Sequence, residues 1–221
     1  MPPDAAPAVG AVAVVYIDEH LIVLHKPSGL LSVPGRGPDK QDCLSARVQA
    51  QYPDALVVHR LDMATSGLIV MARGAAMQRA LNAAFSNRLV HKTYEAVVSG
   101  TVNCDDSSWH TIDLPIAVDW PNRPLRTINH DAGQASQTRY RVIATRADTA
   151  TTRLALEPLT GRTHQLRVHL QAIGHPILGD ALYAPPTVVA QAPRLLLHAS
   201  SLAFAHPVDG RALHFTCAAD F

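Results

Sequence analysis

Short segments rich in β-branched and aliphatic residues, bounded by turn residues, recur along most of this chain. The first two lie at 12–17 and 21–24, with the turn residues Asp18, Glu19 and His20 between them, a pattern that predicts paired strands. The same pattern predicts strands at 56–58, 67–71, 93–98, 136–145, 152–156, 195–204 and 212–217.

Helical spacing of apolar residues is rarer than this strand pattern. It occurs at 75–85, through Met77, Leu81 and Phe85, and at 163–173, which ends at Gly174. A third helix is predicted at 41–52, stopping before Pro53. Many strands with few helices between them predict an α+β fold, with a mixed, mainly antiparallel sheet flanked by helices and long loops. The long loops are 26–38 and the loop-rich stretch 100–135.

Length and composition are compatible with one globular domain. The chain has 221 residues, 48% of them hydrophobic and 17% charged, with a net charge of +1. These values exclude a disordered chain, a coiled coil and a strongly basic tail. We expect a flexible arm at 1–11, which contains three prolines, and a single domain at 12–221. Most of the cations are arginine, which suits anion binding, although genomic base composition would produce the same excess.

No targeting segment is evident. The start, MPPDAAPAVG, lacks the basic and apolar regions of a signal peptide, and no apolar run is long enough to span a bilayer. Cys43, Cys104 and Cys217 are far apart and form no CxxC pair, which predicts free thiols. We therefore expect a cytoplasmic protein without a membrane partner.

The segment HRLDMATSG at 59–67 is unusual for a connection between strands. It places the carboxylate of Asp62 beside Arg60 and ends in a Thr-Ser-Gly corner, which can hold an aspartate through hydroxyl and N–H groups. An Asp-capped turn without chemistry is the alternative interpretation.

This segment resembles the H-R-L-D-x-x-T-S-G loop of the RluA-type pseudouridine synthases. Other segments resemble that family in the same order, from about residue 12 onward. They are KPSGLLSVPG (26–35), KTY (92–94), DWPNRP (119–124), TGRTHQLRVH (160–169), GHPILGD (174–180) and LLLHA (195–199).

The resemblance implies a pseudouridine synthase catalytic domain that isomerises uridine in RNA and needs no cofactor. The uracil leaves ribose C1′, rotates and rejoins through C5. Asp62 matches the family's catalytic aspartate. It can attack C1′ or stabilise an oxocarbenium-like centre, or it can remove the 2′ proton to give a glycal, and both routes stay open.

The resemblance assigns roles to further residues. Arg167 matches the arginine that pairs with the aspartate, and Tyr94 matches an active-site tyrosine that stacks on the base and can help remove the C5 proton. Arg60 is expected to fill the space of the flipped-out nucleotide. The remaining substrate-binding candidates are Arg123, Arg162, His164 and Leu196.

The implied partner is RNA, namely a tRNA anticodon stem-loop, a large-subunit (23S) rRNA hairpin, or both, bound by a monomer. We expect Arg36, Lys40, Arg123 and Arg126, which lie in loops, to contact it.

Other functions are less consistent with the sequence. Among the twelve histidines, His164, His169 and His175 are close in sequence but lack a zinc-binding pattern, so we predict no metal. A non-catalytic RNA-binding protein would not need Asp62, Tyr94 and Arg167 together. A nucleosidase or glycosidase would need a second carboxylate, and Glu95 alternates to the strand face opposite Tyr94.

Overall fold

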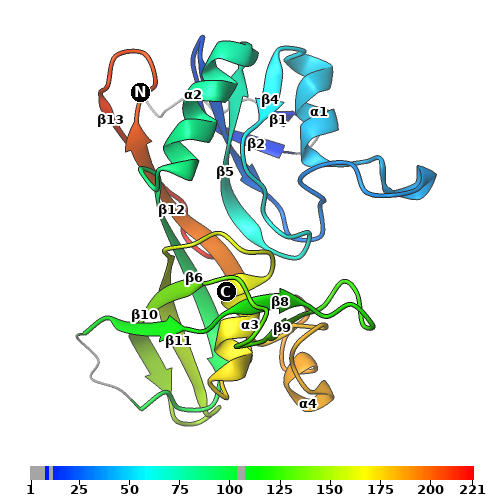
Figure 1. Ribbon diagram of the computed structural model, residues 1–221, viewed down its shortest axis with the longest axis vertical. Helices are drawn as coiled ribbons and strands as arrows, with labels where there is room; N and C mark the ends of the chain where they lie inside the picture. The colour runs from blue at the N-terminus through cyan, green and yellow to red at the C-terminus, as the bar shows by residue number, and fades with distance from the viewer. Residues whose placement is uncertain (1–7, 10–11, 104–107) are drawn as a thin grey trace. The chain divides into compact units, whose positions relative to one another are not determined.

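The chain folds into two compact units in the computed structural model, which describes residues 8–9, 12–103 and 108–221. The first unit comprises the described residues up to Lys92 together with 199–220, and the second comprises 93–198 and Phe221. Each unit has its own strands and helices (Figure 1).

Five strands of the first unit are neighbours in the order β1-β2-β3-β5-β12, with β4 added to β5 and β13 added to β12. The pairs β1–β2, β2–β3, β3–β5, β4–β5 and β12–β13 are antiparallel. The strand bounds are β1 (Ala8–Val9), β2 (Val12–Ile17), β3 (Leu21–Lys26), β4 (Ala55–Val57), β5 (Ser66–Arg73), β12 (Leu197–Ala205) and β13 (Ala212–Thr216).

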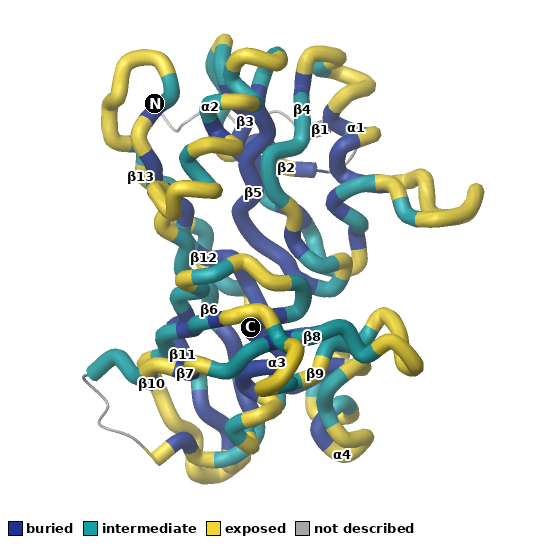
Figure 2. Tube along the Cα trace, in the orientation of Figure 1, coloured by how far each residue is buried: buried dark blue, intermediate teal, exposed yellow. Residues whose placement is uncertain are grey.

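The core of this unit lies between its sheet and α2 (Gly74–Ser86). Leu81 of α2 joins Val23, Val70 and Phe204 in one buried apolar cluster, and each such side chain stabilises the fold by roughly 1.5–3 kcal/mol. Figure 2 shows β5 buried over nearly its whole length. A short helix, η1 (Pro38–Lys40), and α1 (Leu44–Gln51) precede β4.

The second unit is built on an antiparallel sheet in the order β6-β11-β10-β7. A separate hairpin, β8–β9, contacts α3, which also contacts β10 and β11. The elements are β6 (His91–Ser99), β7 (His110–Asp113), β8 (Ile116–Val118), β9 (Arg126–Ile128), β10 (Gln137–Arg146), β11 (Thr151–Pro158), α3 (Gln165–Ala172) and α4 (Pro186–Val189).

The predicted α+β class and mainly antiparallel pairing are confirmed, whereas several element bounds differ. The helix predicted from residue 41 begins at Leu44, because the Cys43 sulfur caps it by accepting from the Ala46 N–H. The helix predicted from 163 begins at Gln165, because His164 has a left-handed backbone. The stretch 100–135, predicted as loop-rich, also contains β7, β8 and β9, which are short and lie among its turn residues.

Part of the predicted N-terminal arm pairs with the sheet. Ala8 and Val9 form β1 against β2, and residues 1–7 and 10–11 lie outside the described residues, so the 1–11 and 12–221 boundaries stay a prediction. Cys104 also lies outside them, whereas Cys43 and Cys217 form no disulfide among the described residues, as predicted. None of the helices among the described residues combines the length and apolar character needed to cross a membrane.

Candidate active site

The loop that carries Asp62 connects β4 to β5 in the first unit. Leu61 and Thr65 are buried, Asp62 is half-buried, and Arg60 and Met63 are exposed. A hydrogen bond of 3.1 Å from the Thr65 N–H to the Asp62 carbonyl closes a turn between them. The sequence HRLDMATS therefore places one carboxylate at the border between core and solvent.

Lys26, at the end of β3, ties this turn to the loop 26–32. Its side chain is 0% exposed, and its ammonium donates to the carbonyls of Pro27 (2.9 Å), Leu30 (2.7 Å) and Met63 (3.0 Å). Burial lowers the pKa of Lys26 to about 8, and the nearby Asp62 carboxylate acts in the opposite direction. The Lys26 ammonium, with its lowered pKa, is thus held next to the turn that carries Asp62.

Two serines and a backbone N–H complete this support. Ser28 donates to the Ala64 carbonyl at 2.7 Å, and the Gly29 N–H donates to the Met63 carbonyl at 2.9 Å. The Ser32 hydroxyl donates to the Leu61 carbonyl at 2.7 Å and accepts from the Leu61 N–H at 3.1 Å. Every carbonyl from residue 61 to residue 64 therefore accepts a hydrogen bond, which fixes the backbone around Asp62.

The ends of the loop are fixed as well. His59 accepts from the Val70 N–H at 3.0 Å and stacks on Phe85 at 4.5 Å between ring centroids, and burial lowers its pKa to about 3, so it is neutral. Gly67 has φ +113°, and a Cβ there would lie 2.3 Å from the Ala199 carbonyl oxygen. Only glycine permits this approach of β5 to β12.

In the second unit, Arg167 projects from α3 into a buried ion pair that the sequence analysis did not predict. Its Nε and Nη2 contact the two oxygens of Asp180 at 2.9 and 2.6 Å, with both side chains at most 5% exposed. The same carboxylate accepts from the Leu182 and Tyr183 N–H groups. Asp180 therefore fixes the orientation of Arg167 through a bidentate contact.

Tyr183 extends this arrangement. The Arg167 guanidinium lies 5.0 Å from the centre of the Tyr183 ring, and the Tyr183 hydroxyl lies 2.6 Å from His164 Nδ1. Gly179, which directly precedes Asp180, has φ +70°, and a Cβ there would lie 1.9 Å from the Arg194 carbonyl oxygen. The match of GHPILGD to the family pointed to this segment but gave no role to Asp180.

The loop that opens α3 carries two of the predicted residues. His164 has φ +59°, an unfavourable conformation for a non-glycine residue, and its contact with Tyr183 is available to offset the strain. Arg162 is exposed, and its Nε donates to the Ala135 carbonyl at 3.5 Å. Buried Gln165 holds this loop by accepting from Thr160 Oγ1 and the Arg162 N–H.

Tyr94 and Leu196 also belong to the second unit. Tyr94 is half-buried on β6, on the strand face shared with buried Ala96 and Val98. Leu195 and Leu197 are core residues, only 2% and 3% exposed, whereas Leu196 between them is half-buried. Of this apolar triplet, only Leu196 keeps surface available for a base.

The predicted residues are thus grouped within each unit. Arg60 and Asp62 share one loop of the first unit, and the other predicted catalytic and substrate-binding residues belong to the second. Arg123, in the β8–β9 connection, is exposed and lies 3.6 Å over the Trp120 ring. The catalytic and binding roles of all these residues stay predictions.

The histidines that were close in sequence have separate partners. His169 contacts Thr138 Oγ1 and the Leu114 carbonyl, and His175 contacts the Ser99 carbonyl.

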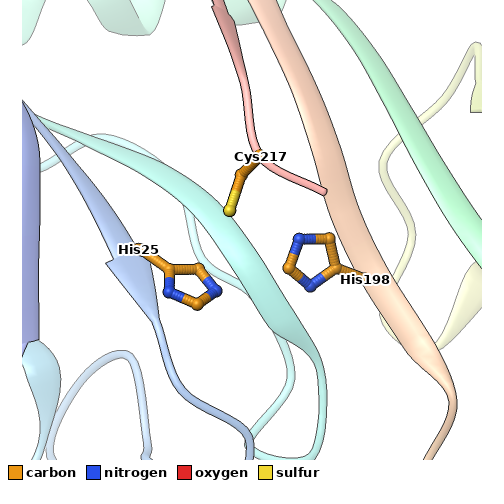
Figure 3. A group of neighbouring side chains, drawn as sticks. All are labelled: His25, His198 and Cys217. Atoms are coloured by element: carbon orange, nitrogen blue, oxygen red, sulfur yellow. The ribbon is translucent and has the colours of Figure 1, made fainter. Parts of the chain in front are cut away.

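Figure 3 shows three other side chains, His25 of β3, His198 of β12 and Cys217, which follows β13. Burial raises the pKa of the Cys217 thiol, which therefore stays protonated near neutral pH.

Comparison with known proteins identifies the family of this chain. Residues 20–172 match the family model described as RNA pseudouridylate synthase, a range that includes parts of both units. The chain is 51% identical over 208 residues to the dual-specificity RNA pseudouridine synthase RluA of Yersinia pestis, covering 94% of this chain and 99% of the relative. It is 49% identical to the RluA of Escherichia coli K12, covering 94% and 93%.

A solved structure is also similar. The human RNA pseudouridylate synthase domain containing 1 superposes with a TM-score of 0.77 at 28% sequence identity, covering 99% of this chain and 86% of that one. The α+β arrangement is therefore shared with a protein of the same description.

Proposed function

Because this chain belongs to the RNA pseudouridylate synthase family, we propose that it isomerises uridines in structured RNA to pseudouridine with Asp62 as the catalytic residue. The observation that carries this proposal is the loop around Asp62. Its consecutive carbonyls are all hydrogen-bonded, and its carboxylate lies at the border between core and solvent. Such preorganisation suits a group that reacts with a positioned ribose.

Some of these residues carry out the proposed chemistry, and others orient Asp62 or bind the substrate. Asp62 attacks C1′ or removes the 2′ proton, and Lys26, Ser28 and Ser32 hold the backbone that aims it. Tyr94 stacks on the uracil and assists loss of the C5 proton, with Leu196 as an apolar wall. Arg60 occupies the space that the flipped nucleotide leaves. Arg167 is the counter-charge that keeps Asp62 ionised, and Arg162 and His164 contact a phosphate or order Arg167.

The substrates we propose are a tRNA anticodon stem-loop and a 23S rRNA hairpin, modified by a monomer in the cytoplasm. The relatives named above carry "dual-specificity" in their names, which supports two kinds of RNA substrate. The hydrolytic alternative is weakened because Glu95 is in an ion pair with Arg153 at 2.7 Å, on the strand face opposite Tyr94. A non-catalytic binder would not require the supported Asp62 turn.

Tritium release from RNA labelled at uridine C5 tests the reaction directly, because C5 loses its hydrogen only when pseudouridine forms. We expect the purified protein to release tritium from tRNA and 23S rRNA transcripts. Mapping pseudouridines in cells with and without the gene then identifies the positions. Binding of both RNAs without tritium release would identify a non-catalytic RNA-binding protein instead.

A further inference from the structure

A groove of about 500 Å³ lies in the second unit, between the β8–β9 hairpin and the loop that opens α3. Its polar lining comes from Arg126, Asn129, Gln134, Arg162 and Thr163, and Trp120 adds an aromatic ring. No described acidic side chain lines it. The groove is therefore cationic and partly aromatic.

The two arginines are held at the backbone, and neither is ion-paired among the described residues. The Arg126 N–H donates to the Tyr183 hydroxyl at 3.0 Å, and the Arg162 N–H donates to the Gln165 side-chain oxygen at 3.0 Å. Each guanidinium donates to one carbonyl, that of Leu125 or Ala135, which leaves most of its five N–H donors for a ligand. Two such cations on one groove suit a phosphodiester.

Trp120 supplies a surface for stacking. Its side chain belongs to a residue that is 66% exposed, and the Arg123 guanidinium covers one face of the ring at 3.6 Å. Because the residue remains largely exposed with this guanidinium in place, ring surface is left for a planar ligand. Proteins that bind single-stranded nucleic acids combine an exposed aromatic ring with nearby cations in this way.

We propose that this groove binds one unpaired nucleotide of the substrate RNA, with the base on Trp120 and its phosphate at Arg126 and Arg162. The proposal rests on the proposed function, since it assumes an RNA substrate. It makes Trp120 and Arg126 determinants of substrate binding, together with Arg162, which lines the same groove, and Arg123, which covers the Trp120 ring. The exposed amide of Gln134 is suited to hydrogen bonding with a base edge.

Tryptophan fluorescence tests the stacking contact. The chain has two tryptophans, so a Trp109→Phe variant keeps Trp120 as its only tryptophan. We expect a short single-stranded uridine oligonucleotide to quench this emission, and the added substitutions Arg126→Gln and Arg162→Gln to abolish the quenching at the same oligonucleotide concentration. Unchanged emission at concentrations that saturate RNA binding would overturn the contact.

Kinetics then test the groove against the proposed function. Trp120→Ala should raise KM for an RNA hairpin about 10-fold or more, with a smaller effect on kcat. Replacing Arg126 and Arg162 by Gln should lower the salt dependence of binding by about 0.7 per lost phosphate contact. Arg146→Gln is the matched control, because Arg146 is exposed at the end of β10 and does not line the groove.

The possible failures are distinguishable. If the wild-type protein releases tritium and the groove variants keep the KM and salt dependence of Arg146→Gln, the groove does not bind the RNA. If the wild-type protein releases no tritium from any RNA, the proposed function itself is overturned.

Discussion

Different interactions position the two charged residues on which the proposed chemistry depends. The Asp62 loop is held through its main chain, where four successive carbonyls accept hydrogen bonds, three of them from Lys26, Ser28 and Ser32. Arg167 is held through its own side chain, by a bidentate ion pair with Asp180. The first arrangement divides the support among several neutral and charged donors, and the second includes a buried bidentate ion pair.

This difference predicts how each part fails. A single hydrogen bond contributes about 0.5–1.5 kcal/mol net, so the Asp62 loop should weaken in steps as its donors are removed. A buried ion pair that loses one partner leaves an uncompensated charge, and the loss is about 3–5 kcal/mol. A single substitution in the Arg167–Asp180 pair should therefore lower stability more than the loss of any one donor to the Asp62 loop.

The largest expected effect is that of Asp180→Asn. It removes the carboxylate that contacts both Nε and Nη2 of buried Arg167, so the free energy of unfolding should fall by about 3–5 kcal/mol, with a loss of turnover. Urea denaturation measures the first effect and tritium release measures the second. Asp42→Asn, which removes the exposed partner of Arg47, is the control and should change stability little.

A double variant sharpens this result. Arg167→Met combined with Asp180→Asn removes both charges and keeps a side-chain oxygen for the Leu182 and Tyr183 N–H groups, so most of the lost stability should return while turnover stays low. A double variant as unstable as Asp180→Asn would show that lost packing, and not the loss of charge balance at Arg167, is responsible.

Lys26→Met should have the next largest effect. It removes a donor to three carbonyls, partly offset by removal of a buried charge, and should lower the free energy of unfolding by about 2 kcal/mol. Turnover should fall further than that of Lys40→Met, the exposed-lysine control for stability. Equal stability of the two variants in urea would mean that Lys26 does not hold the Asp62 loop.

The two serines should have smaller, graded effects. Ser32 both donates to and accepts from buried Leu61, so Ser32→Ala should cost about 2 kcal/mol or somewhat less. Ser28 makes one bond, to the Ala64 carbonyl, and Ser28→Ala should cost about 1 kcal/mol. Thermal unfolding of the two variants measures the order, and the reverse order would contradict the assigned contacts.

The smallest predicted effect is a pH dependence. The pKa of Lys26 is lowered from 10.5 to about 8 in the folded protein, so between these values the unfolded chain binds more protons. Stability should then rise with pH, by about 1 kcal/mol between pH 8 and pH 9. The measurement is the difference between wild type and Lys26→Met over this range, and a difference that is constant with pH would contradict the lowered pKa.

The sequence predicts the strand-rich fold and the position of Asp62 because both depend on local patterns. Alternation and turn residues locate most strands, and the nine residues at 59–67 are contiguous. The helix starts were less accurate, because the Cys43 cap and the left-handed His164 decide them. The three-residue β4 is predicted, whereas the equally short β8 is not, because β8 lies in a stretch dominated by turn residues.

The residues that hold the Asp62 loop and Arg167 are not predictable from the sequence, for a different reason. Lys26 and Asp180 lie in segments that resemble the family, yet their partners, Met63 and Arg167, are 37 and 13 residues away along the chain. Nothing in local spacing predicts such pairs. A lysine at the end of an apolar strand, followed by a Gly/Pro loop, is the sequence signal that could have suggested a role for Lys26.

The most direct test of the central claim is single-turnover pseudouridine formation by Asp62→Asn at saturating RNA. This nearly isosteric change keeps the hydrogen-bonded backbone and removes only the carboxylate charge. The rate should fall by at least about a hundredfold, with RNA affinity close to that of the wild type. A variant that still forms pseudouridine at the wild-type rate would contradict the assignment of the chemistry to Asp62.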